Sequence, residues 1–202
     1  LLTEGASGFH RTGYHYPPHN LYLDPIKLIA SQKKTTTEAK PYFSLGTRTI
    51  ATKSGLTKVS AKAKVTKSVN LQFSSFERPS WSWSGKRQAW VRFDSGAPAM
   101  TVMPAGTVRI QANNVVVLRV TSADAGYRDP AGNYVPRTIF TGKGSGYLFS
   151  AGKRLPITWS KATLSSTVVL KDTEGNRVTL EPGNTWVELV PLDGGAVKFT
   201  SK

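Results

Sequence analysis

The sequence predicts a mainly β protein, α+β overall: an antiparallel β-sandwich or barrel with one or two short helices in the N-terminal part. Two observations carry this prediction. The 202 residues include 18 glycines and 12 prolines, which recur between short apolar runs, a pattern typical of strands and turns. Apolar and polar residues also alternate over 59–73, as they do in a strand that buries one face.

The first element that the sequence indicates is a short helix at 24–32. Asp24 is a residue type favoured at the helix N-cap, and Pro25 occupies the first helical position, where its missing N–H costs nothing. The next segment, 33–41, is polar and predicts a loop.

The segment 59–73 predicts one long strand, or two strands joined by a bulge. Lys67 is the one interruption of its apolar row, and the opposite row carries Lys62 and Lys64 among polar residues. We therefore expect one buried face and one wet, basic face. These lysines belong to a wider segment, 39–76, that has many basic residues and no acidic residue.

Strand-like runs then recur to the C-terminus, at Ala89–Phe93, Val115–Val120, Tyr147–Ser150, Thr167–Lys171, Val178–Glu181, Thr185–Val190 and Ala196–Thr200. The segments 172–176 and 193–195 have the composition of hairpin turns. The glycine-rich run 142–146 leads into a strand and not into a helix. We therefore interpret it as a strand entrance or bulge, because a phosphate-binding loop must open a helix.

Composition excludes several classes of chemistry. The chain has no cysteine, so a disulfide, a thiolate nucleophile and a zinc–cysteine site are all excluded. No apolar run approaches the roughly 20 residues of a membrane helix.

The net charge is +15, which attracts polyanions such as nucleic acid, anionic lipid headgroups or phosphate-rich wall polymers. The alternative is a basic face that only confers solubility.

The three histidines of the chain are close neighbours: His10, His15 and His19. Two prolines in the same stretch fix the backbone and limit the entropy lost when side chains converge on a ligand. We predict a binding site formed by Arg11, His19, Asn20 and Tyr22, with His19 as the candidate catalytic residue.

The sequence also contains residue types for a metal site and for a serine hydrolase. Three imidazoles at this spacing could hold a divalent metal ion. Proline-rich loops, however, often hold histidines that only stack or hydrogen-bond, so we predict no metal ion and no cofactor. A serine hydrolase is not indicated, because no serine lies in a Gly-x-Ser-x-Gly elbow and Ser145 only comes near to one.

Aromatic and basic residues lie together at two further places. Trp81, Trp83 and Trp90 come shortly before Arg92, and tryptophans beside a cation could stack on sugar rings or bases. Core packing is the simpler interpretation for tryptophans that alternate along a strand. Lys161 follows Trp159 at a distance of two residues, which places it to reach an anion. We include Arg92, Trp159 and Lys161 among the candidate binding residues.

A set of motifs in a fixed order spans nearly the whole chain. They are Arg11, Pro18-His19-Asn20-Leu21-Tyr22, Trp90-x-Arg92, Asn114-Val115-Val116-Val117, Gly142-x-Gly144, Gly152-Lys153, Trp159-x-Lys161 and Pro182-Gly183-x-x-Trp186-Val187-Glu188-Leu189-Val190-Pro191. In order and spacing they resemble the YerB-like family of bacterial lipoproteins of unknown function. The resemblance adds Asn114 to the candidate binding residues.

The resemblance implies two domains and a location. Residues 1–55 would be the C-terminal remnant of an α/β first domain, and residues 56–202 an antiparallel β-rich domain. The family's Gly- and Arg-rich first segment and its lipobox cysteine have no counterpart in this sequence. An extracytoplasmic protein is expected, in contact with the cell membrane through a lipid anchor on a missing N-terminus. The family supplies no established enzymatic activity.

Two functions are consistent with these features. The first is a non-catalytic binding or scaffold module of the bacterial cell envelope, whose partner is an anionic cell-wall polymer or an envelope protein. The second is an envelope hydrolase or transferase with His19 as general base and with Arg11 and Asn20 as clamps for an oxyanion or phosphate. Nucleic-acid binding rests on charge alone, because no recognition motif is found.

Overall fold

The computed structural model describes residues 8–13, 16, 20–31, 41–44, 63–103 and 105–201. The chain divides into two compact units, Leu1–Lys40 and Pro41–Lys202. The domain boundary expected after residue 55 lies outside the described residues. Residues 41–44 pair within the second unit, where Phe43 bridges Val168 and the Ser44 carbonyl accepts a hydrogen bond from Leu180 N. No helix in these described ranges is long and apolar enough to cross a membrane.

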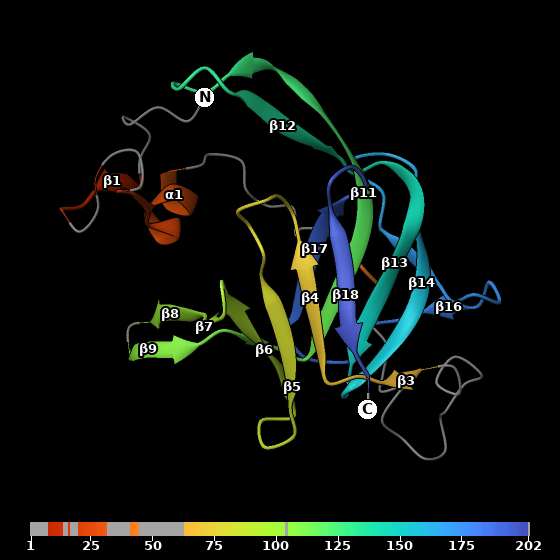
Figure 1. Ribbon diagram of the computed structural model, residues 1–202. Coiled ribbons are helices and arrows are strands. Elements are labelled where there is room, and N and C mark those ends of the chain that lie inside the picture. Colours follow the sequence, from red (N-terminus) through yellow and green to blue (C-terminus); the bar gives the residue numbers. More distant parts are fainter. Residues whose placement is uncertain are drawn as a thin grey trace. The chain divides into compact units, whose positions relative to one another are not determined.

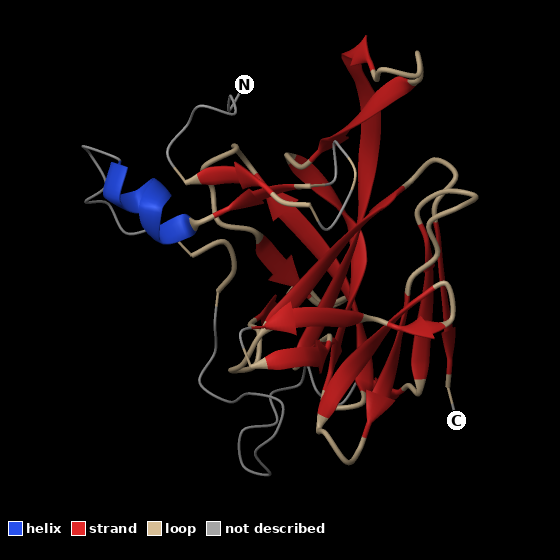
Figure 2. Cartoon of the chain, turned by 90° about the vertical axis from the view of Figure 1, so that its left-hand side faces the viewer, coloured by secondary structure: helices blue, strands red, loops and turns tan. Residues whose placement is uncertain are grey.

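The first unit is a small hairpin followed by one helix. Figure 2 draws the helix in blue and the hairpin strands in red. Strands β1 (Phe9–Arg11) and β2 (Leu21–Leu23) are antiparallel, and α1 spans Pro25–Ser31. The Asp24 carboxylate accepts hydrogen bonds from the backbone N–H groups of Ile26 and Lys27, at 3.0 and 3.1 Å. The helix therefore begins with the cap and the proline that the sequence indicates.

The second unit contains two large sheets and a separate hairpin (Figure 1). The larger sheet has the order β12-β11-β13-β14-β15-β16, with β17 beside β11 and β3 beside β14. Its strands are β3 (Lys64–Val65), β11 (Asn114–Arg128), β12 (Tyr134–Ile139), β13 (Gly142–Ser150), β14 (Lys153–Lys161), β15 (Val169–Lys171), β16 (Arg177–Val178) and β17 (Thr185–Pro191). Within this sheet β17 runs parallel to β11, and the other pairs are antiparallel.

The smaller sheet has the order β10-β6-β5-β4-β18, with β7 beside β6. Its strands are β4 (Ser68–Gln72), β5 (Ser80–Ser84), β6 (Ala89–Asp94), β7 (Ala97–Pro98), β10 (Gln111–Ala112) and β18 (Ala196–Thr200), and the hairpin is formed by β8 (Met100–Met103) and β9 (Gly106–Arg109). The mainly β prediction is confirmed, and its form is a sandwich, because neither described sheet closes into a barrel.

The alternating segment at 59–73 belongs to both sheets. Residues 59–62 lie outside the described part, but β3 pairs with β14 in the larger sheet and β4 pairs with β5 and β18 in the smaller one. The interruption at Lys67 is the crossing point: Thr66 N donates to the Gly152 carbonyl and Lys67 N to the Thr200 carbonyl. Two strands are therefore present, and they are joined by a change of sheet instead of a bulge.

The larger sheet buries apolar residues on both of its faces. One face forms a core within the larger sheet itself, with Val116, Leu118, Leu148, Leu155, Ile157, Trp159, Leu170 and Val178. The other face packs against the smaller sheet through Val69, Leu71, Trp81, Trp90, Val115, Val117, Phe149 and Val190. This second core joins the sandwich.

An ion pair crosses that second core. Glu188 of β17 is 5% exposed, and its Oε1 accepts hydrogen bonds from Arg92 Nη1 at 2.5 Å and from Trp81 Nε1 at 2.8 Å. The guanidinium carbon of Arg92 lies 5.7 Å from the ring centre of Trp81 and 5.0 Å from that of Trp186. Burial raises the pKa of Glu188, although the Trp81 hydrogen bond and the charge of Arg92 act in the opposite direction.

The glycine-rich run at 142–146 forms the first half of β13, in agreement with its interpretation as the entrance to a strand. A Cβ at Gly146 would lie 2.2 Å from the Val117 carbonyl oxygen, and one at Gly144 would lie 2.6 Å from Trp159 Nε1. These glycines therefore allow close approach of β11 and of a core tryptophan. They do not cradle an anion.

Replacing Arg92 with methionine is expected to lower the free energy of unfolding by about 3 to 5 kcal/mol at pH 7, because Glu188 would stay buried without its cation. A raised pKa means that the folded protein holds this proton to higher pH than the unfolded chain does. The free energy of unfolding therefore falls as pH rises above the ordinary value of 4.5.

The fall should be steeper in Arg92→Met than in the wild type, so urea unfolding at pH 5 and pH 7 measures the difference. Adding Glu188→Gln should restore part of the loss at pH 7, because the amide still accepts from Trp81. An equal loss at both pH values, with no recovery in the double variant, would contradict this account of the ion pair.

Substituting Gly146 with alanine is expected to cost about 1 to 3 kcal/mol of stability, since the new methyl group would overlap the Val117 carbonyl. Gly85→Ala is the matched control, because nothing lies within 4 Å of a Cβ there, and it should change stability by less than about 0.5 kcal/mol. Denaturant unfolding compares the two variants, and equal effects would refute the close approach of β13 and β11.

Candidate functional site

Six exposed polar residues lie on one face of the larger sheet. In the register of the strands, Ser145, Thr158, Lys171 and Arg177 form one row across β13, β14, β15 and β16. Lys143 and Ser160 begin a second row beside it. We call these six residues, Lys143, Ser145, Thr158, Ser160, Lys171 and Arg177, the cationic sheet face.

The cationic sheet face continues the face that packs against the smaller sheet. Side chains alternate along a strand, so Lys143 and Ser145 share a face with Tyr147 and Phe149 of the same strand. Tyr147 and Phe149 belong to the second core, whereas Lys143 and Ser145 are exposed. The larger sheet thus extends beyond the area that the smaller sheet covers, and the extension carries polar residues.

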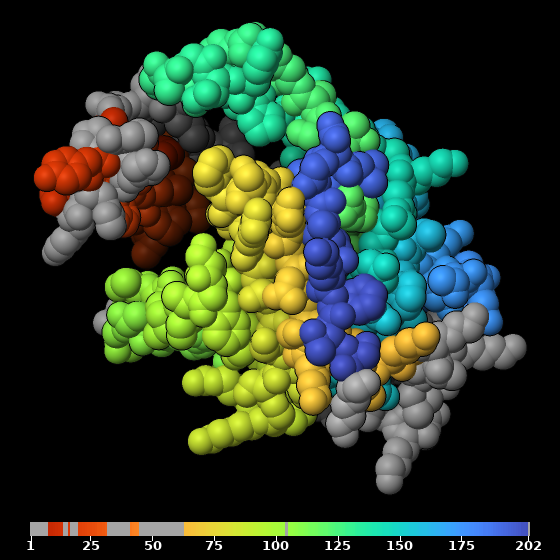
Figure 3. Space-filling model, viewed as in Figure 1, coloured from red at the N-terminus to blue at the C-terminus, as the bar shows by residue number. Residues whose placement is uncertain are grey.

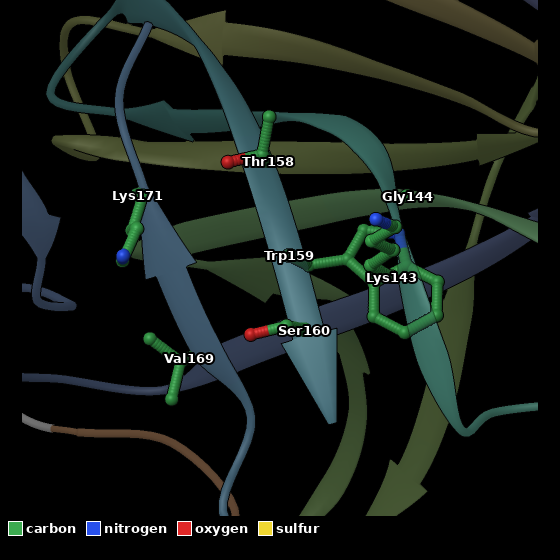
Figure 4. Close-up of a pocket in the computed structure, with 7 residues that line it drawn as sticks. All are labelled: Lys143, Gly144, Thr158, Trp159, Ser160, Val169 and Lys171. Atoms are coloured by element: carbon green, nitrogen blue, oxygen red, sulfur yellow. The ribbon is translucent and has the colours of Figure 1, made fainter. Parts of the chain in front are cut away.

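A hollow of about 470 Å³ lies on this extension. Figure 4 shows Thr158 and Ser160 on the central strand β14, with Lys171 on one neighbouring strand and Lys143 on the other. Val169, Gly144 and Trp159 complete the lining. Hydroxyl groups and ammonium groups therefore surround one shallow depression.

The three cations of this face carry no compensating charge. Within the described residues, Lys143, Lys171 and Arg177 form no ion pair, and no carboxylate stands in either row. Ammonium, guanidinium and hydroxyl groups are all donors for phosphate or carboxylate oxygens. The arrangement can bind an anionic ligand without moving any buried group.

Trp159 and Lys161, which the sequence indicates as binding residues, lie on the opposite face of β14. Trp159 is buried in the first core and donates through Nε1 to the Arg119 carbonyl. Lys161 is 1% exposed, and its Nζ donates to the carbonyls of Leu164 and Ser166 at 2.8 and 2.5 Å. Both side chains therefore stabilise the fold from inside.

Arg92 and Asn114 are also engaged within the sandwich. Arg92 pairs with Glu188, and its Nε lies 2.8 Å from Asp94 Oδ1. Asn114 is fully buried; its Nδ2 donates to the Glu181 carbonyl and its Oδ1 accepts from Ser150. These contacts give both residues a structural role.

The histidine segment is described only in part, since His15 and His19 lie outside the described residues. Arg11 Nη1 donates to Asn20 Oδ1 at 2.5 Å, and Asn20 Nδ2 donates to the Thr12 carbonyl. Tyr22 is exposed and stacks on His10, with ring centres 6.2 Å apart. Arg11 and Asn20 are thus in contact, and the binding or catalytic role proposed for these residues and for His19 stays a prediction. Among the described residues, no three His, Asp or Glu side chains form a metal-binding group.

Sequence reasoning did not single out the cationic sheet face. Its signal is present in two places: Lys143 and Ser145 alternate with glycines, and Thr158 and Ser160 alternate with Ile157 and Trp159. The motif Trp159-x-Lys161 instead indicates an anion contact at Lys161, whose side chain lies on the other face of the strand from these hydroxyls. Only the strand register unites the six residues, because they come from four strands.

Comparisons with known proteins agree with this fold. Residues 69–187 match a family described as the C-terminal domain of a protein of unknown function, DUF3048, and all six residues of the cationic sheet face lie in that range. The crystal structure of the YerB protein from Bacillus subtilis has a TM-score of 0.68 to this chain at 21% identity, over 95% of this chain and 60% of that one. This chain thus spans 60% of the length of that structure. No curated protein matches the sequence.

Lys161→Met is expected to destabilise the fold by about 1 to 3 kcal/mol, because the carbonyls of Leu164 and Ser166 would lose the hydrogen bonds that they accept from the buried ammonium group. Lys171→Met, on the neighbouring strand, serves as the control and should leave stability within about 0.5 kcal/mol of the wild type, since Lys171 is exposed. Thermal and urea unfolding of both variants measure this difference. A neutral Lys161→Met would show that this lysine is free to act elsewhere.

Proposed function

The chain belongs to the YerB-like family that the DUF3048 C-terminal domain defines, and because the function of that family is unknown we propose one from the sheet face itself. The protein is a non-catalytic binding or scaffold module that holds an anionic polymer of the bacterial cell envelope. The cationic sheet face is its binding surface. The observation that carries this proposal is the set of three unpaired cations and three hydroxyls on the uncovered extension of the larger sheet.

The arrangement of the donors suits a chain-like ligand. Neighbouring strands are about 4.8 Å apart, so the row of Ser145, Thr158, Lys171 and Arg177 offers donors at regular steps across four strands. A linear polymer with repeated negative groups can contact several of these donors together. A single small anion would meet only one or two of them.

The same face offers the groups for binding and not for catalysis. Its ionisable side chains are two lysines and an arginine, which donate hydrogen bonds and accept none, and no histidine or carboxylate stands in its two rows. The carboxyl group whose pKa is raised, Glu188, is held in the second core by Arg92 and Trp81. The hydrolase or transferase alternative at His19, Arg11 and Asn20 stays a prediction of the sequence.

The proposed location of the protein is outside the cytoplasm, at the cell membrane. The resemblance to bacterial lipoproteins supports an extracytoplasmic module that a lipid anchor on a preceding segment holds at the cell membrane. An anionic wall polymer would be within reach of such a protein. Electrostatic attraction between this polymer and a chain of net charge +15 would increase the rate of association and weaken with added salt.

Reversing the charge of the face tests the proposal. The variant Lys143→Glu/Lys171→Glu/Arg177→Glu should lose most of its co-sedimentation with bacterial wall sacculi, by about tenfold or more in affinity, because three attractive contacts become repulsive. Sacculi from which the anionic phosphodiester polymers have been removed should bind little of the wild type or of the triple variant.

The matched control is Lys58→Glu/Lys62→Glu/Lys64→Glu, which changes the net charge by the same amount on the segment that the sequence predicts to be basic. This control should keep most of the binding. If both triple variants lose binding equally, bulk charge is responsible and the cationic sheet face is not a site. If only the control loses binding, the site lies on that other segment.

A further inference from the structure

The strand β11 extends beyond its neighbour and leaves an open sheet edge. Residues 114–120 of β11 pair with β17 on one side, and residues 121–128 pair with β12 on the opposite side. The last contact on the β17 side is the hydrogen bond from Leu192 N to the Val120 carbonyl, at 2.8 Å. Beyond this point β11 and β12 form a long arm that projects from the sandwich (Figure 1).

The open edge has free backbone groups at known positions. Backbone groups of successive residues point to opposite sides of a strand, so Ser122 and Asp124 present their N–H and C=O on the same side as Val120. Both residues are exposed. In the described part of the chain, no strand pairs with them on that side. Four backbone groups are thus available to another strand.

A groove lies beside this edge. Its volume is about 730 Å³, and its lining combines apolar groups from three elements, Phe73, Leu189, Pro191 and Pro136, with the carboxylates of Asp124 and Asp193. Figure 3 shows the arm overhanging the loop that follows β4. The groove therefore combines apolar side chains with two carboxylates.

Negative charge is notable in a chain that has 27 basic and 12 acidic residues. Asp124 Oδ1 accepts a hydrogen bond from Gly126 N at 2.9 Å, and the Asp124 side chain lines the groove. Neither carboxylate forms an ion pair within the described residues. A cationic side chain would be attracted here, whereas a polyanion would be repelled.

We propose that this edge binds an extended, lysine- or arginine-bearing peptide segment of a partner protein, which adds to β11 as a further strand. Main-chain hydrogen bonds to Ser122 and Asp124 would supply affinity, and alternate side chains would enter the groove. The peptide would continue the edge that β17 occupies up to Val120. This site shares no residue with the cationic sheet face, so either proposal stands if the other fails.

The chain also has a feature that limits unspecific pairing at this edge. The register between β11 and β12 shifts between Asp124 and Arg128, and Gly126 has a positive φ of 84°. A bulge of this kind twists an edge away from indiscriminate partners. The open segment is thus short, and the side chains in the groove must contribute to recognition.

Amide hydrogen exchange measured by NMR tests the proposal directly. The probe is a capped octapeptide of alternating valine and lysine, and its comparison is the same peptide with glutamate in place of lysine. On binding, the amides of Ser122 and Asp124 should become protected at least tenfold, while Thr121 and Ala123 are already paired with β12. The glutamate peptide should bind about tenfold more weakly or not at all.

Two substitutions locate the contacts. Ser122→Pro removes an edge donor without removing a hydrogen bond to β12, and it should weaken binding of the valine–lysine peptide about tenfold. Asp193→Asn should weaken it several-fold, whereas its matched control Glu174→Gln, outside the groove, should not. Asp193 is exposed, so this variant keeps the test valid if Ser122→Pro perturbs the fold.

Three results would overturn the proposal. They are no binding of the valine–lysine peptide at millimolar concentration, equal binding of the valine–glutamate peptide, and protection of amides elsewhere with Ser122 and Asp124 unchanged. Loss of wall-polymer binding in the triple variant of the cationic sheet face has no bearing on these outcomes, because the two sites are composed of different residues.

Discussion

Arg92 of the smaller sheet and Glu188 of the larger sheet form a buried ion pair at the core that joins the two sheets. The carboxylate also accepts from Trp81, and the guanidinium lies against Trp81 and Trp186. A buried pair of this kind costs desolvation and therefore tolerates little displacement. It therefore constrains how the smaller sheet lies on the larger one, because a shift between the sheets would separate a buried carboxylate from its cation.

Two parts of the larger sheet lie beyond the area that the smaller sheet covers. On β13, Tyr147 and Phe149 are covered, and Lys143 and Ser145 are not. At the far end of β11 the smaller sheet and β17 both stop, which leaves the projecting arm and its groove. One surface is basic and rich in hydroxyl groups, and the other is apolar with two carboxylates. A scaffold protein could use both, with a polymer on one and a peptide on the other.

Local sequence patterns predicted the elements whose stabilising contacts are local. The N-cap at Asp24, the glycine-rich entrance to β13 and the mainly β class are of this kind. The sequence did not predict the strand β14, because Pro156 and two buried cations interrupt its alternation of apolar and polar residues. Arg154 lies over the Phe199 ring, and Lys161 donates to backbone carbonyls. The crossing at Lys67 and the cationic sheet face depend on pairing between distant strands, which no local pattern specifies.

The most direct test of the central claim is an NMR titration of the protein with a linear polyphosphate at physiological salt. If the extension of the larger sheet is the binding surface, the shifts will concentrate on the backbone and side chains of Lys143, Ser145, Thr158, Ser160, Lys171 and Arg177. Shifts distributed over basic residues across the whole surface, or centred on Arg11 and Asn20, would contradict it.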